Sequence, residues 1–94
     1  MDSATLIFEN LCKLSIIEEK INICRRKIIF FSLNKFYGIV LDIQSEHNNL
    51  LDKYYLLNNE ITNFKTCIDN TIYDKLYMIA VKYGRFKVYS ESIS

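Results

Sequence analysis

The chain has 94 residues, half of them hydrophobic and 14% aromatic, which is enough apolar material for one small folded domain and too much for a disordered chain. Its 12 Lys and Arg residues nearly balance 11 Asp and Glu residues, which argues against a protein that binds nucleic acid alone through its own positive field. The balance of charge does not exclude one subunit of a ring whose positive charge is shared among its subunits.

Cysteine and histidine content argues against a metal site. The three cysteines (Cys12, Cys24 and Cys67) have no CxxC spacing, and the chain has a single histidine. We expect free thiols packed as small apolar groups in a reducing compartment. No nucleophile–base pair or glycine-rich phosphate loop occurs, so we expect no catalysis and no cofactor. No apolar run long enough to span a bilayer and no signal-peptide pattern occurs, which predicts a soluble intracellular protein.

The N-terminal region has helical patterning. Residues 1–13 are predicted to form a short helix as an N-terminal extension, because their apolar side chains recur at helical spacing. Ser15 and Glu18 then form a capping-box pattern that opens a second helical segment. Residues 25–27 are three consecutive cations. They suit a helix C-terminus and could equally face a phosphate backbone.

From residue 28 onward the chain is rich in the β-branched and aromatic residues that strands favour. Two such runs, 28–33 and 36–43, flank Asn34-Lys35 and predict a β-hairpin. Three further strands are expected at 50–57, 72–82 and 86–89. An extended loop is expected over about 58–71 and a tail over 91–94.

A helical alternative fits the middle of the chain. Ten positions fall on the a and d sites of a heptad repeat and are apolar in nine cases: Phe36, Val40, Ile43, His47, Leu50, Tyr54, Leu57, Ile61, Phe64 and Ile68. The pattern stops on both sides, and the neighbouring e and g positions show no ordered charge pattern. This alternative predicts an all-helical coiled-coil scaffold without RNA contact.

The order of the expected elements resembles the Sm and Sm-like protein family over residues 14–90. The first family motif is matched in spacing by Gly38, Val40, Ile43, Asn48, Leu50 and Leu51. The second is matched by Val81, Lys82, Tyr83, Gly84, Arg85 and Phe86. Residues 14–17 with Ile21 also resemble the N-terminal helix of one spliceosomal Sm subunit. The sequence departs from the motifs at Gln44, Lys82 and Tyr83, where the family usually has Asp, Arg and Gly.

The resemblance implies a mainly β fold, a small five-stranded open barrel with an N-terminal α-helix. The implied function is that of a non-catalytic core subunit of a heteroheptameric ring. Such a ring binds single-stranded, uridine-rich small nuclear RNA during pre-mRNA splicing, in the nucleus after a cytoplasmic assembly phase. A second possibility within the family is an Sm-like ring that binds RNA 3′ ends. The implied partners are other ring subunits and RNA, without a membrane, a metal ion or a small-molecule substrate.

The same resemblance implies the site residues. Asn48 or Asn49, depending on register, would bind the base edge, His47 would stack, and Lys82 would flank the base or phosphate beside Gly84. The two last strands would pair with neighbouring subunits. The subunit interface would then contain Leu76, Ile79, Val81, Phe86 and Val88.

Overall fold

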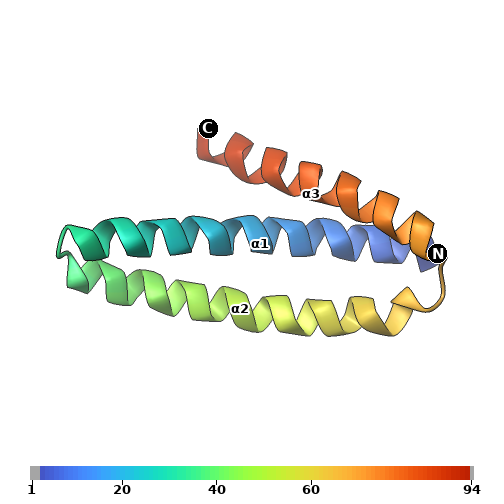
Figure 1. Ribbon diagram of the computed structural model, residues 1–94, viewed down its shortest axis with the longest axis horizontal. Coiled ribbons are helices and arrows are strands. Elements are labelled where there is room, and N and C mark those ends of the chain that lie inside the picture. Colours follow the sequence, from blue (N-terminus) through green and yellow to red (C-terminus); the bar gives the residue numbers. More distant parts are fainter. Residues whose placement is uncertain (1–2, 94) are drawn as a thin grey trace.

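The computed structural model describes residues 3–93 and shows three α-helices (Figure 1). Helix α1 spans Ser3–Leu33, α2 spans Tyr37–Lys65 and α3 spans Asn70–Ile93. Residues 3–93 contain no β-strand. The predicted mainly β Sm barrel is therefore wrong, and with it the Sm, ribonucleoprotein and splicing assignment. The all-helical chain fits the helical scaffold alternative better than the Sm ring.

The heptad pattern on α2 explains why this segment is a helix. Val40, Leu50 and Ile61 are buried along one face. The remaining central positions of the repeat, and Ile68 just beyond the helix, are half-buried: Ile43, His47, Tyr54, Leu57 and Ile68. Only Phe36 and Phe64, near the two ends, are exposed. An apolar pattern with a period of 3.5 residues allows a helix to bury one face. In this segment that pattern outweighs the β-like composition.

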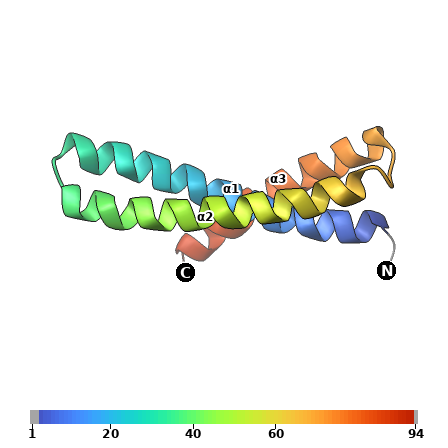
Figure 2. The ribbon, with the colours of Figure 1, turned by 90° about the horizontal axis from the view of Figure 1, so that it is seen from below.

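Helix α1 has apolar residues around most of its circumference because it is packed on two sides. It lies between α2, which runs antiparallel to it, and α3, which crosses it (Figures 1 and 2). The run 28–33, predicted as a strand, forms the last turns of this helix. Ser15 lies in the middle of α1 and is buried, so the predicted capping box does not begin a helix.

Two clusters form the core. The larger lies where all three helices meet, and its buried members are Ile7, Leu11, Leu14, Ile61 and Ala80. The smaller joins α1 to α2 through Ile21, Cys24 and Leu50. Beyond these clusters, the α1–α2 hairpin extends past the end of α3 (Figure 1). The radius of gyration of 15.6 Å therefore exceeds the value of about 12 Å expected for a compact domain of this length.

The connections are short. The turn predicted at Asn34-Lys35 is present, with Lys35 at a φ of 63°, but it joins two helices instead of two strands. Residues 58–65, expected in an extended loop, continue α2, and residues 66–69 make the connection to α3. Residues 91–93, expected in a tail, continue α3, whereas residues 1, 2 and 94 lie outside the described part.

Candidate functional site

The position of α3 is fixed by a close crossing with α1. A stripe at i, i+4 and i+8 (Ala80, Gly84 and Val88) faces α1 and is buried. A Cβ placed on Gly84 would lie 2.6 Å from the Cβ of Ser15 and 2.8 Å from its carbonyl carbon. The two backbones therefore approach more closely at this point than any residue with a side chain would permit.

A polar contact holds α3 beyond this crossing. The Nε of Arg85 donates to the Oε1 of Glu19 at 3.2 Å, and the hydroxyl of Tyr89 donates to Oε2 at 3.3 Å. Arg26 in turn donates to the Tyr89 hydroxyl at 3.1 Å. The crossing and these contacts together determine which face of α3 points away from α1.

A second apolar pattern runs along α3 beside the buried stripe. It contains five residues at alternating spacings of four and three, the heptad spacing of helix–helix pairing: Ile72, Leu76, Ile79, Tyr83 and Phe86. We call this set the outer seam of α3. Phe86 is 71% exposed and Ile79 is 55% exposed, whereas Leu76 is half-buried against the larger core cluster. Among the described residues, the seam is covered only in part, at Leu76, and its other four members stay exposed.

Two lysines border the outer seam. Lys75 and Lys82 directly precede Leu76 and Tyr83, so both lie on the same flank of the seam, and both are exposed. Neither forms an ion pair with another described residue. The nearby Lys87 pairs with Glu91, at 3.4 Å. The flank at Lys75 and Lys82 therefore presents uncompensated positive charge beside apolar side chains.

A shallow groove between α1 and α3 continues the seam. It has a volume of about 370 Å³ and is lined by Phe8, Glu9, Cys12, Lys13, Ile16 and Tyr83. Tyr83 belongs to both the groove and the seam. Burial, and secondarily the charge of Glu9, raise the pKa of the Cys12 thiol, so this cysteine is an apolar lining residue more than a nucleophile.

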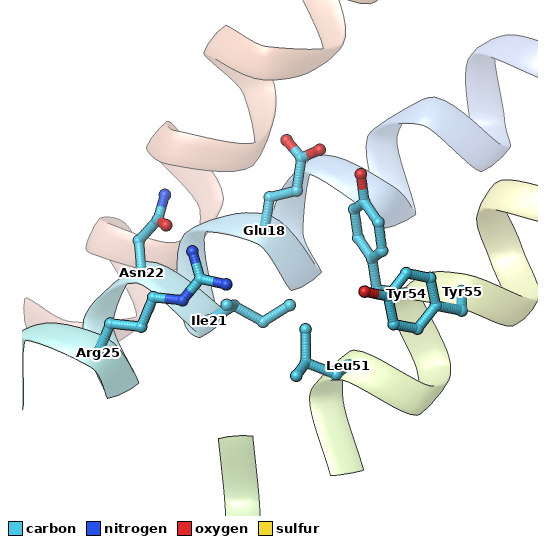
Figure 3. A pocket seen from close by; sticks show the side chains of 7 residues that line it. All are labelled: Glu18, Ile21, Asn22, Arg25, Leu51, Tyr54 and Tyr55. Carbon is cyan, nitrogen blue, oxygen red and sulfur yellow. The ribbon is translucent and has the colours of Figure 1, made fainter. Parts of the chain in front are cut away.

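An open cleft of about 300 Å³ lies on α1 and α2, beside the crossing (Figure 3). Its lining residues are Glu18, Ile21, Asn22, Arg25, Leu51, Tyr54 and Tyr55. Desolvation raises the pKa of Glu18, although a hydrogen bond with Tyr54 works in the opposite direction. Arg25 donates from its Nε to the Nε2 of His47 at 3.3 Å. The carboxyl and phenol sit together, but among the described residues no nucleophile accompanies them.

The residues proposed to bind RNA are not brought together. Asn48 and Asn49 are exposed on α2, and His47 is half-buried and bonded to Arg25. Lys82 lies on the far side of α3, and Gly84 is buried at the helix crossing. The pocket implied by the Sm resemblance required two adjacent loops, and those positions are now within separate helices. Binding of RNA by individual residues of this set stays a prediction.

The residues proposed for a subunit interface are all on α3 and not on strand edges. Val88 is buried against α1 and Val81 is half-buried. Leu76, Ile79 and Phe86 belong to the outer seam. The helical period thus divides the set between two faces, which a strand pattern could not anticipate. The signal that could have identified the seam is the alternating spacing of residues 72–86.

Other candidate sites are weaker. Residues 3–93 bring no three His, Cys, Asp or Glu residues together as a metal site would need. Within the same residues, no helix combines the length and apolar content of a membrane span. The chain matches no known protein family, no curated protein and no solved structure.

Proposed function

We propose that this protein is a non-catalytic helical scaffold module that binds an amphipathic helix of a partner protein along the outer seam of α3. The observation that carries this proposal is a largely exposed apolar seam at heptad spacing on a helix whose adjacent face is already buried against α1. Exposed apolar side chains that are scattered singly need no explanation, but an ordered stripe of them marks a binding surface.

The geometry of the seam favours a helix as the partner. Alternating spacings of four and three residues place side chains where a second helix can insert its own apolar residues between them. The groove beside Tyr83 widens this surface toward α1, so the partner helix would contact both helices. Packing of this kind would complete a bundle of four helices, in which each apolar face is covered.

The charges favour an acidic partner over a second copy of the chain. If two copies paired in parallel through this seam, Lys82 of one would face Lys87 of the other. In an antiparallel pair, Lys75 and Lys82 of one copy would face Lys75 and Lys82 of the other. Either arrangement opposes like charges, whereas Asp or Glu beside the partner's apolar residues would attract them.

A peptide-binding measurement tests this proposal. The probes are two labelled heptad peptides with Leu at positions a and d, one with Glu and the other with Lys at positions e and g. Fluorescence anisotropy with the full chain should show that the acidic peptide binds at least about tenfold more tightly than the basic peptide. Substitution of Lys75→Glu together with Lys82→Glu should reverse this preference.

Matched variants locate the surface. Ile79→Ser and Phe86→Ser should each weaken binding of the acidic peptide about tenfold or more, because apolar anchors dominate such interfaces. Met78 is also on α3 and 63% exposed, but it lies off the seam, so Met78→Ser should leave binding unchanged. Equal affinity for both peptides, or equal losses from Met78→Ser and Phe86→Ser, would contradict the proposal.

A further inference from the structure

The groove between α1 and α3 is large enough for an aromatic side chain. Its volume is about 370 Å³, whereas an apolar cavity of about 150 Å³ already holds a benzene molecule. A leucine of a partner helix would leave much of the groove empty, and unfilled apolar space weakens packing. Tyr83 belongs to both the groove and the outer seam of α3. A helix that lies on the seam can therefore place one large side chain in the groove.

The walls of the groove are apolar and include two aromatic rings. Phe8, Cys12 and Ile16 of α1 are half-buried, and Tyr83 lines the groove from α3. Phe8 and Cys12 also pack against the larger core cluster, which holds these walls in place. Aromatic rings pair favourably with other rings, and a polarizable sulfur packs well against a ring edge. The lining therefore favours an aromatic occupant over an aliphatic one.

The α1 side of the groove carries one hydrogen-bond acceptor and one cation. Glu9 and Lys13 are exposed, lie one helical turn apart and form no ion pair with another described residue. The charge of Glu9 contributes to the raised pKa of the Cys12 thiol, so this carboxylate lies near the apolar wall. A carboxylate accepts hydrogen bonds and cannot donate them, whereas a lysine ammonium can lie over the face of an aromatic ring. These two groups favour an aromatic occupant that carries a donor.

We propose that the groove binds a tryptophan side chain of the partner helix. The indole ring would pack between Phe8, Ile16 and Tyr83, and its N–H would donate to the carboxylate of Glu9. Indole has two rings, a single donor and the most favourable aromatic face for a cation. Phenylalanine lacks the donor, and tyrosine has only one ring. This inference rests on the proposed function, because the same helix would occupy the outer seam of α3.

Tryptophan fluorescence tests the proposal, because the chain itself contains no tryptophan. The probes are versions of the acidic heptad peptide with Trp at position a, d, e or g of the central heptad, and matched peptides with Phe at the same position. With the full chain, one Trp peptide should bind at least about tenfold more tightly than the parent peptide, and its emission should shift to the blue. The matched Phe peptide should bind about threefold more weakly than this Trp peptide, because it lacks one hydrogen bond.

Variants of the chain locate the tryptophan. Cys12→Phe fills the groove and should abolish both the blue shift and the gain in affinity, whereas Cys12→Ala should preserve both. Glu9→Ala removes the acceptor and should bring the ratio of the Trp and Phe affinities to about one. This ratio cancels the change in net charge, which affects both peptides alike. Glu9 is exposed, so its variant should keep the native fold even if Cys12→Phe does not.

The outcomes distinguish this inference from the proposed function. Failure of every acidic peptide to bind would overturn both. Binding of the parent peptide without a gain from Trp at any of the four positions would overturn the tryptophan site alone. A gain that persists in both Cys12→Phe and Glu9→Ala would place the tryptophan outside the groove, and this result would also overturn the site.

Discussion

Gly84 of α3 and Ser15 of α1 lie in close contact, since a Cβ at Gly84 would lie 2.6 Å from the Cβ of Ser15. Both positions are buried, and the contact lies where α3 crosses α1. This pair sets the distance and angle at which α3 rests on α1. It thereby determines that the outer seam of α3 faces outward.

Gly84→Ala should destabilise the protein by about 1–3 kcal/mol, because the added methyl group overpacks the crossing. The loss outweighs the gain of about 1 kcal/mol that alanine brings to a helix interior. Chemical denaturation followed by circular dichroism measures the difference.

Gly38→Ala is the matched control. No atom lies within 4 Å of a Cβ at Gly38, in the first turn of α2. The substitution should stabilise the protein by a few tenths of a kcal/mol, up to about 1 kcal/mol. If both glycine variants were stabilised equally, the close crossing would be disproved.

Ile61→Ala should cost about 2–5 kcal/mol, because it leaves a cavity where the three helices meet. Ile61 is 1% exposed, whereas Leu56, on the same helix, is 69% exposed. Leu56→Ala should therefore change the free energy of unfolding by no more than about 0.5 kcal/mol. Comparable losses in the two variants would mean that α2 buries a different face.

The raised pKa of Glu18 predicts how the stability of the protein depends on pH. Desolvation raises its pKa above the ordinary value of 4.5 in the folded state. The folded protein therefore binds more protons than the unfolded chain in the pH range just above 4.5, and the contribution of Glu18 to stability falls as pH rises through its raised pKa.

Glu18→Gln should accordingly be more stable than the native protein at neutral pH, and this advantage should shrink as the pH falls toward 4. Denaturant unfolding across this range measures the difference. Tyr54→Phe removes the hydrogen bond that lowers the pKa of Glu18, so it should steepen the same dependence. A difference between Glu18→Gln and the native protein that did not vary with pH would contradict this assignment.

The cysteines should react with a thiol reagent in the order of their exposure. Cys67 is exposed, Cys12 is half-buried and Cys24 is buried. Burial also raises the pKa of Cys12 and Cys24, which lowers the fraction of reactive thiolate. Mass spectrometry should show one rapid modification, at Cys67, and modification of Cys24 only on unfolding. Rapid labelling of Cys24 in the native protein would contradict the packing of α1 against α2.

The heptad spacing correctly predicts helix α2, whereas the β-like composition wrongly predicts strands. The apolar residues Val40, Leu50 and Ile61 recur at a helical period, and burial of one face follows from that period alone. The run 28–33 looks like a strand because it is rich in Ile and Phe, and the run 72–82 because it contains Ile, Tyr and Val. Strand preference depends on packing against neighbouring strands, so composition without a period is a weak guide.

The candidate site was harder to predict because α3 has two apolar faces. Ala80, Gly84 and Val88 face α1, while Ile79 and Phe86 face outward, and the sequence alone does not say which face is covered. The Sm resemblance also assigned Gly84 to an RNA-binding site, although this residue permits a close helix crossing. That distinction requires knowledge of the residue on the facing helix, Ser15.

The proposed binding surface depends on the chain being a bundle of three helices. Far-ultraviolet circular dichroism of the purified full-length protein tests this claim most directly. We expect the double minimum of a predominantly helical protein, lost in one cooperative transition on heating. A spectrum dominated by β-structure would contradict the bundle and, with it, the outer seam of α3.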